Sequence, residues 1–312
     1  MASGRVRNHE VRCVWPLGAA LGEGPVWIVE EASVYGVDIL RRTLFRYEPS
    51  RRRAEICTMP VAMTSLAPMT DGRLLCTAAR QIHAFDTRSG HLTSIRTLDA
   101  GAEAIRINDG CCHPDGAFWF GTMDLGEHAP VGDFYRLSAE GTCERLAASF
   151  AITNGPAFAP DGRRGYFVDS IERRILCAPM EQGRLVGPLR PFVRVPASDG
   201  FPDGIAVDAE GGVWCAHWGA GKVTRFDADG RASDVIPMPV SNVTKCAFGG
   251  GRLERLFITT ARKGLDAAML ASQPLAGGFF EADVGYRGVP APRYRGAPHS
   301  EGAFHTCVFE QS

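Results

Sequence analysis

The sequence predicts an all-β chain folded as a single six-bladed β-propeller. Short apolar runs of strand length alternate with turn residues throughout the 312 residues, which include 36 glycines and 20 prolines. No convincing helical-period segment interrupts them, and a β-sandwich rarely shows so regular a repeat. Closing such repeats into a ring protects the sheet edges. The turn glycines recur at roughly the 40 to 50 residue period of propeller blades, at Gly72, Gly116, Gly162, Gly211 and Gly251.

The first repeat reads as a four-stranded meander. Apolar residues 26–29 and 34–37 are separated by a turn, and strands are predicted to follow at 43–47 and 53–58. Five further repeats each open with an apolar run, a turn and a second apolar run, at residues 65–76, 108–120, 154–169, 203–218 and 243–260. We therefore expect one domain over residues 1–312, with a short N-terminal tail at residues 1–10.

Composition argues against several classes of partner. Lys and Arg total 34 and Asp and Glu total 35, so no one-signed surface for nucleic acid or a membrane is expected. Residues 1–14 lack the apolar core of a signal peptide, and no run approaches a membrane span. The ten cysteines include no CxxC pair. We expect a soluble protein of a reducing compartment, the cytoplasm.

Four polar residues occupy comparable places in the repeats. In a propeller, the residue just before each innermost strand is expected to face the central channel. Each of these residues precedes a glycine by one or two positions, which lets the backbone approach the axis; they are Glu23, Asn108, Asn154 and Asp203. Each alone is compatible with an ordinary turn. Together, two carboxylates and two amides form the all-oxygen set that hard divalent cations prefer.

Other catalytic motifs are missing from the sequence. There is no Gly-x-Ser-x-Gly, no His-Glu-x-x-His and no glycine-rich phosphate loop. A serine-hydrolase mechanism therefore has no support.

In combination, the motifs resemble those of a known family. They include Leu21-Gly22-Glu23-Gly24-Pro25, Asn108-Asp109-Gly110, Asn154-Gly155-Pro156 and Asp203-Gly204. With them the chain resembles the regucalcin/gluconolactonase-like sugar lactonases, which are six-bladed propellers with one divalent metal in the channel. Residues 152–156 and 259–265 look most like the bacterial aldonolactonases.

The resemblance implies roles for particular residues. It implies Glu23, Asn154 and Asp203 as ligands of one divalent cation, which could be Ca, Zn, Mn, Mg or Fe(II). It implies Arg106 and Asn108 as substrate contacts and Asp203 as the general base. Relatives such as regucalcin carry a glutamate after Gly-Thr-Met that contacts substrate hydroxyls. The matching position here is Gly126, which leaves two possible stand-ins, Asp124 and Glu127.

The expected activity is metal-dependent hydrolysis of a sugar lactone to its aldonic acid. The expected partner is the small-molecule lactone, and the expected assembly is a monomer or a weak homo-oligomer. Two alternatives stay open: a non-catalytic calcium- or metal-binding regulatory propeller, and a metal-dependent phosphotriesterase. Arg106 argues against pure ion binding, because a metal site has no need of a neighbouring cation.

Overall fold

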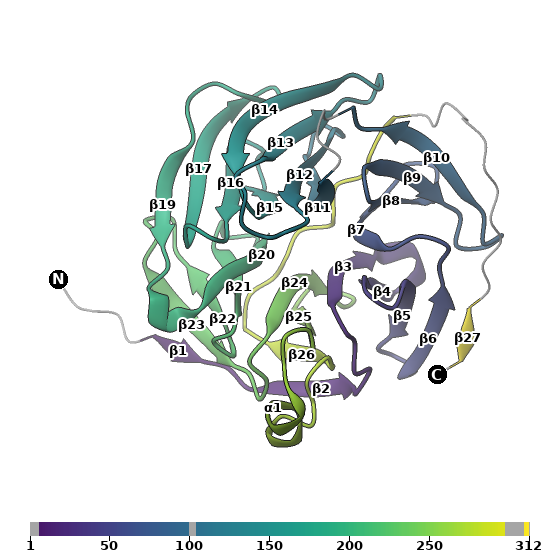
Figure 1. Cartoon of the computed structure of the whole chain (residues 1–312), viewed down its shortest axis with the longest axis vertical. Coiled ribbons are helices and arrows are strands. Elements are labelled where there is room, and N and C mark those ends of the chain that lie inside the picture. Colours follow the sequence, from purple (N-terminus) through teal and green to yellow (C-terminus); the bar gives the residue numbers. More distant parts are fainter. Residues whose placement is uncertain (1–5, 100–103, 297–308, 312) are drawn as a thin grey trace.

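The structure is a computed structural model that describes residues 6–99, 104–296 and 309–311. In the described residues, six sheets of mainly antiparallel strands stand around a central axis, and each forms one blade of a propeller (Figure 1). The six-bladed fold predicted from the sequence is confirmed. Blades are numbered here in chain order of their innermost strands.

The strands of each blade follow one another from the axis outward, with a few additions at the rim. The first blade contains β3 (Gly22–Ile28), β4 (Ser33–Asp38), β5 (Thr43–Glu48), β6 (Arg53–Thr58) and β27 (Glu310–Gln311). The second contains β7 (Met63–Pro68), β8 (Leu74–Ala78), β9 (Gln81–Phe85) and β10 (Leu92–Thr97). The third contains β11 (Ile105–Cys112), β12 (Phe118–Asp124), β13 (Gly132–Leu137) and β14 (Cys143–Phe150).

The remaining blades complete the ring. The fourth contains β15 (Thr153–Phe158), β16 (Arg164–Asp169), β17 (Arg174–Glu181), β18 (Arg184–Leu185) and β19 (Arg190–Arg194). The fifth contains β20 (Phe201–Val207), β21 (Val213–Trp218), β22 (Lys222–Phe226), β23 (Ala232–Pro237) and β1 (Arg7–Asn8). The sixth contains β24 (Val243–Gly249), β25 (Arg255–Thr260), β26 (Phe279–Asp283) and β2 (Val11–Trp15). The inner strands β3, β7, β11, β15, β20 and β24 contact one another in turn and close the ring.

Both ends of the chain extend blades that are distant in sequence. Strand β2 pairs with β26, so residues from the N-terminal part complete the sixth blade and close the ring. Strand β1 pairs in parallel with β23, and β27 pairs with β6. Residues 7–8 were expected to belong to a tail, and they form β1 instead. A two-residue strand has no periodic signal of its own, because its pairing depends on where the ring brings its partner.

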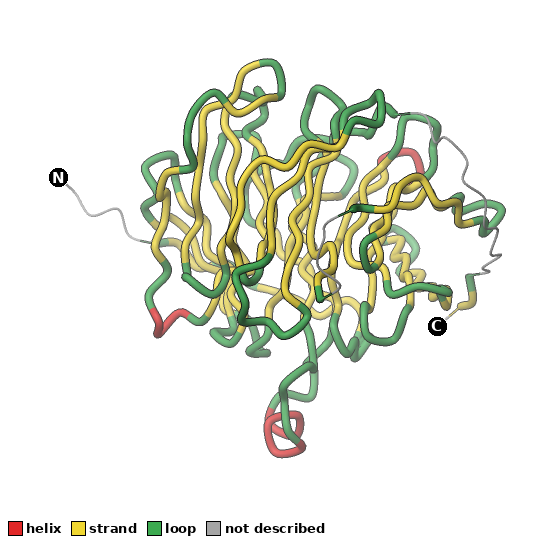
Figure 2. The backbone as a smooth tube through the Cα atoms, turned by 45° about the horizontal axis from the view of Figure 1, so that its top comes forward, coloured by secondary structure: helices red, strands yellow, loops and turns green. Residues whose placement is uncertain are grey.

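In the part of the chain that the structure describes, three short helices interrupt the strands: η1 (Val29–Glu31), η2 (Ala197–Asp199) and α1 (Ala267–Ser272). Figure 2 shows α1 projecting from the disc, where the Asp266 side chain accepts a 2.8 Å hydrogen bond from the Met269 amide at its N-terminus. Within the described residues, no helix combines the length and hydropathy that a membrane span requires.

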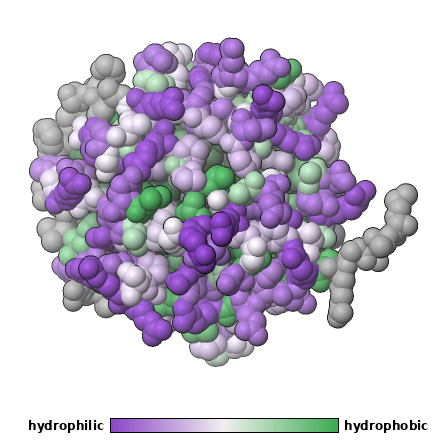
Figure 3. All heavy atoms as spheres, turned by 180° about the vertical axis from the view of Figure 1, so that it is seen from behind, coloured by the Kyte–Doolittle hydropathy of each residue, from purple (hydrophilic) through white to green (hydrophobic). Residues whose placement is uncertain are grey.

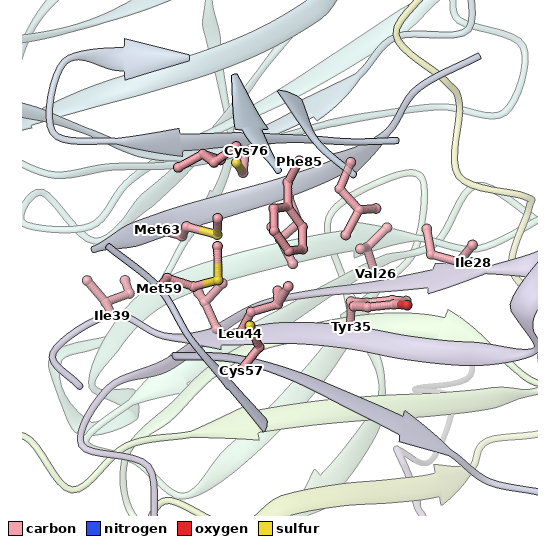
Figure 4. Packing of buried hydrophobic residues seen from close by; sticks show 14 of the residues in the cluster. Val26, Ile28, Tyr35, Ile39, Leu44, Cys57, Met59, Met63, Cys76 and Phe85 are labelled. Atoms are coloured by element: carbon pink, nitrogen blue, oxygen red, sulfur yellow. The ribbon is translucent and has the colours of Figure 1, made fainter. Parts of the chain in front are cut away.

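Apolar side chains fill the spaces between neighbouring blades. Between the first and second blades, for example, Tyr35 and Leu44 pack with Met63 and Phe85 in a cluster without solvent exposure above a few per cent (Figure 4). These alternating inward side chains produce the strand pattern that the sequence displays. The face of the disc seen in Figure 3 is mainly hydrophilic, with a small hydrophobic group near its middle. The packed blades thus form a rigid frame around the channel.

A segment after β26 crosses the ring at one end of the channel. Residues 284–296, drawn in yellow, run across the middle of the disc in Figure 1. The Arg287 carbonyl accepts a 2.7 Å hydrogen bond from Ala209 in the fifth blade, and Gly288 donates to Leu253 in the sixth. Farther along, the Tyr294 carbonyl accepts from Thr70 in the second blade. These hydrogen bonds join the segment to the second, fifth and sixth blades, and residues 289–292 line the cavity at that end.

Candidate active site

A cavity of about 410 Å³ occupies the opposite end of the channel. Its polar and charged lining includes all but one of the residues proposed from the sequence, namely Glu23, Arg106, Asn108, Glu127, Asn154 and Asp203. Apolar side chains form much of the remaining wall, from Leu21, Ile39, Met123, Ile152, Ile171, Phe201 and Trp218. A wall of this kind with a few convergent polar groups is typical of a small-molecule site.

A β-bulge in each inner strand turns the polar side chains toward the axis. The strand register shifts after Glu23 in β3, after Ile107 in β11, after Asn154 in β15 and after Pro202 in β20. The candidate residues therefore lie within the strands, whereas the sequence analysis placed them just before. A bulge re-aims a side chain while the flanking residues stay paired, so four different blades can deliver polar groups to one place.

The bulges in the inner strands of the second and sixth blades carry threonine in place of a carboxylate or amide residue. Their bulge residues are Thr64 and Thr244. The Thr64 hydroxyl lies 2.7 Å from that of Thr77, and the Thr244 hydroxyl donates to the Gly22 carbonyl at 2.6 Å. Both hydroxyls are thus used in packing between strands, and neither residue lines the cavity. The oxygen-rich part of the cavity belongs to the other four blades.

Glu23 and Asp203 form a pair of carboxyl groups that repel each other. Burial raises the pKa of Glu23 to about 7, and the charge of Asp109 adds to the effect. Burial also raises the pKa of Asp203 well above its usual range, with the charge of Glu23 as the next cause. Lys245 opposes both shifts without cancelling them. Two buried carboxyl groups, of which Glu23 raises the pKa of Asp203, mark a place where a cation is favoured.

Two asparagines hold a fixed orientation beside these carboxyl groups. The Asn154 amide nitrogen donates to the Ser170 hydroxyl at 3.0 Å, so its oxygen faces the other way. That oxygen accepts from the Asn108 amide at 3.1 Å and keeps a second lone pair. Asn108 in turn accepts a 2.7 Å hydrogen bond from Arg106. The chain of contacts aligns Arg106, Asn108 and Asn154 along one wall.

Arg106 brings a positive charge to this wall. Burial lowers the pKa of its guanidinium, and the carboxylates of Glu127, Glu23 and Asp203 oppose that shift. Within the described residues, its hydrogen bonds to the Asn108 side chain and the Ile107 carbonyl both start from one nitrogen, Nη1. Its other donors are therefore available to a ligand.

Asp124 and Glu127, the two possible replacements for the family glutamate, are placed differently. Asp124 does not line the cavity. Its Oδ2 accepts the backbone amides of His128 at 3.1 Å and Ala129 at 2.8 Å, which shapes the loop after β12. Glu127 does line the cavity, and its carboxylate forms an ion pair with Lys263.

The all-oxygen set fits a hard divalent cation. In the described part of the chain, no three His, Cys, Asp or Glu side chains form a cluster that could hold a metal. The candidate set here contains two carboxylates, Glu23 and Asp203, and its third member is the amide oxygen of Asn154. Carboxylate and amide oxygens are the ligands that Ca²⁺, Mg²⁺ and Mn²⁺ prefer, and the two negative charges lack a full counter-charge.

A family model matches most of the chain. Residues 21–262 match the SMP-30/Gluconolactonase/LRE-like region. The chain belongs to this family. An L-arabinolactonase of Azospirillum brasilense is 38% identical over 89% of this chain and 93% of its own length. A 6-deoxy-6-sulfogluconolactonase of Pseudomonas putida is 32% identical over 93% of this chain and 100% of its own length.

A solved relative has nearly the same architecture. Regucalcin from Agrobacterium tumefaciens, described as a calcium-binding protein, superposes with a TM-score of 0.89 at 32% identity. The superposition covers 95% of this chain and 100% of the relative. Family membership therefore extends over the whole ring of blades and includes every strand that contributes to the cavity.

Sequence reasoning missed three charged residues of the channel. Lys245 and Asp109 form a buried ion pair, and Asp109 also accepts the Gly155 amide at 2.9 Å. Lys263 lies within residues 259–265, to which the sequence analysis gives no role in the site. Gly204 carried an indirect signal, because a Cβ there would lie 2.4 Å from the Lys245 Cγ. Only a glycine beside Asp203 leaves room for the lysine to cross beneath it.

Proposed function

We propose that this protein hydrolyses a sugar-derived lactone to the corresponding aldonic acid, with the help of one divalent cation. The carrying observation is that Glu23, Asn154 and Asp203 share one cavity wall with Arg106 and Asn108. The lactonase names of two relatives that match almost the whole chain give the substrate class. We assign Glu23, Asn154 and Asp203 to the cation, which when bound would supply Lewis acidity at the lactone carbonyl.

The residues of the chain divide the remaining work between binding and proton transfer. Arg106 binds oxygen atoms of the lactone through its unused donors. The amide nitrogen of Asn108 already donates to the Thr153 carbonyl and to Asn154, so Asn108 accepts a lactone hydroxyl through the second lone pair of its Oδ1. Asp203 accepts a proton from the attacking water, whose oxygen forms a bond with the carbonyl carbon. The ring C–O bond then breaks, and the leaving oxygen takes up a proton and becomes a hydroxyl group. The apolar wall from Ile152 to Trp218 excludes bulk water from the reacting end.

A second candidate is a metal-binding protein without catalysis. Its support is the solved relative described as a calcium-binding protein. Arg106 weighs against it, because a guanidinium beside two carboxylate ligands weakens cation binding and gains a purpose only when a substrate is present. No comparable observation favours a phosphotriesterase.

One assay separates the candidates. A panel of pentono- and hexonolactones and one phosphotriester serve as substrates, and a pH indicator reports the protons that hydrolysis releases. Each substrate is tested first with chelator and then with Ca²⁺, Mn²⁺, Mg²⁺, Zn²⁺ or Fe²⁺ added back. We expect turnover of one or more lactones that chelator removes and one of the ions restores. Cation binding in calorimetry without turnover of any lactone would favour a non-catalytic metal-binding protein. Turnover of the phosphotriester alone would favour a phosphotriesterase.

A further inference from the structure

Ser170 brings a hydroxyl group to the cavity wall beside Asn154. It follows β16 in the fourth blade, is 5% exposed and lines the cavity. Its backbone amide donates to the Ile152 carbonyl at 3.1 Å, and its carbonyl accepts from the Arg173 amide at 3.1 Å. The backbone of Ser170 is therefore held on both sides, and its side chain starts from a fixed place.

The hydrogen bonds along this wall all run in one direction, which Arg106 determines. A guanidinium only donates, so the Asn108 atom that it contacts is the amide oxygen. The amide nitrogen of Asn108 then donates to the Asn154 oxygen at 3.1 Å, and the Asn154 nitrogen donates to the Ser170 hydroxyl oxygen at 3.0 Å. Ser170 is therefore the acceptor in its contact with Asn154, and its own hydrogen points elsewhere.

The hydroxyl hydrogen of Ser170 is left for a bound molecule. In the described part of the chain, no protein group accepts a hydrogen bond from it. Ser170 is nearly fully buried and lines the cavity, so a molecule in the cavity is the acceptor that can reach it. Its partner Asn154 belongs to the group assigned to the cation, at the end of the cavity where the lactone carbonyl is expected. Ser170 therefore offers a neutral donor at that end.

We propose that Ser170 donates a hydrogen bond to the carbonyl oxygen of the lactone, as a further catalytic residue. This inference rests on the proposed lactonase function. When the attacking water bonds to the carbonyl carbon, the π electron pair of the C=O bond moves to the carbonyl oxygen. A hydrogen bond to a negative oxygen is stronger than one to a neutral oxygen, so the contact favours the transition state over the bound lactone. When the ring C–O bond breaks, the electron pair forms the carbonyl again, and Ser170 keeps its proton throughout.

The test begins with steady-state kinetics at saturating cation. Ser170→Ala removes the donor with little change in shape. It should lower kcat by about ten- to a hundredfold, the effect of losing one hydrogen bond to a charged oxygen. KM should change little, because the contact is stronger in the transition state than in the bound lactone. Ser170→Thr keeps the hydroxyl group and should retain most of kcat.

A second measurement separates this role from the mere positioning of Asn154. Ser170→Ala also removes the acceptor of the Asn154 nitrogen, but Asn108 still holds the Asn154 oxygen. Calorimetric titration of the cation-free variant should therefore give a cation affinity close to that of the wild type. The matched control is Ser138→Ala, which removes a buried hydroxyl that accepts the Thr142 amide at 3.2 Å and does not line the cavity. It should leave kcat unchanged.

Two kinetic outcomes would overturn the inference. One is an unchanged kcat in Ser170→Ala, and the other is a lowered kcat that excess cation restores, which would leave Ser170 as a support for Asn154 alone.

Binding of two unreactive analogues keeps this result distinct from the fate of the proposed function. A cyclic phosphonate monoester carries the negative, tetrahedral centre of the transition state, and a lactam of the same ring carries a neutral carbonyl. We expect Ser170→Ala to weaken calorimetric binding of the phosphonate by about tenfold or more and that of the lactam much less. This pattern in a protein that hydrolyses no lactone would sink the lactonase and still support the donor. Equal phosphonate binding in the wild type and Ser170→Ala, or none in the wild type, would overturn the donor whatever the turnover.

Discussion

Lys245 and Asp109 form a buried ion pair that joins the sixth blade to the third across the channel. Lys245 lies in β24 and Asp109 in the bulge of β11, and the two are 7% and 3% exposed. Burial works against the charge of Lys245, but Asp109 and Glu23 raise its pKa above the usual value. Asp109 also accepts the amides of Gly110 at 2.7 Å and Gly155 at 2.9 Å, so its charge is well satisfied. The pair forms a cross-brace beneath the carboxylates of the cavity.

The first prediction concerns this cross-brace. Lys245→Met leaves Asp109 buried without its cation, which should lower the free energy of unfolding by about 3–5 kcal/mol. The double variant Lys245→Met/Asp109→Asn should recover part of that loss, because no buried charge remains. Denaturant unfolding measures both. Lys222→Met, which breaks a partly exposed ion pair with Asp199, is the control and should cost about 1 kcal/mol or less. An equal decrease in the free energy of unfolding in Lys245→Met and Lys222→Met would contradict a buried charge pair that stabilises the fold.

The second prediction concerns pH and cation binding. The pKa of Glu23 is raised to about 7 and that of Asp203 is raised as well, so the cation-free cavity is partly protonated near neutrality. A divalent cation needs both groups deprotonated. Its affinity should therefore increase as the pH rises through about 7, with protons released on binding. Calorimetry in buffers of different ionisation enthalpy counts those protons. A cation affinity that is flat between pH 6 and 8 would contradict the assigned ligands.

The same shifts predict how the cation-free protein responds to pH. A carboxyl group whose folded pKa is raised stabilises the fold at low pH, and that contribution is lost as the pH rises toward the folded value. For Glu23 the window runs from its unfolded value of about 4.5 to about 7. Thermal unfolding with chelator should show stability falling across this window. A saturating cation should reverse the trend, because it binds the deprotonated form.

The fold was predictable because each blade repeats the same local pattern. Strands such as β6 and β12 carry apolar residues at strand spacing and end in glycine or proline turns, so each can be recognised without its neighbours. Glu23, Asn154 and Asp203 could be grouped for the same reason, since equivalent places in repeats meet at the axis of a ring. The two-residue strands β1 and β27 carried no such signal.

The charged pairs across the ring were beyond reach of the sequence. Lys245 meets Asp109, and Lys263 meets Glu127, over 136 residues in each case. Whether two long side chains so far apart in the sequence meet in space depends on how the ring of blades closes. Asp124 illustrates the converse problem. A short carboxylate near a turn can face a ligand or cap its own loop, and here it caps the amides of His128 and Ala129.

The third prediction concerns Arg106. Arg106→Ala should lower kcat/KM for a lactone by about ten- to a hundredfold, the effect of losing a hydrogen bond from a charged group to the substrate. Cation occupancy should persist, because Arg106 is not among the assigned ligands and its positive charge opposes the cation. Steady-state kinetics and calorimetric titration of the same preparation test both parts. Loss of the cation together with activity would mean that Arg106 maintains the structure of the site.

The last prediction separates the two roles assigned to Asp203. Asp203→Asn keeps the shape and one oxygen ligand, but it removes the charge and most of the basicity. If Asp203 served only as a ligand, excess cation would restore much of the activity. If it also accepts the proton, the cation can be restored while turnover stays low, since loss of a general base typically costs about 10²–10⁴-fold. We expect the second result.

The comparison that decides this is kcat at saturating cation, with occupancy measured independently by calorimetry. Glu23→Gln is the matched control, because it also removes one carboxylate from the pair but leaves the proposed proton acceptor, Asp203, in place. Its activity should recover with added cation much further than that of Asp203→Asn. In the cation-free protein, burial and then the charge of Glu23 raise the pKa of Asp203 well above its usual range. Near-normal kcat in the fully loaded Asp203→Asn protein would remove Asp203 as the base and leave the attacking water in need of another acceptor.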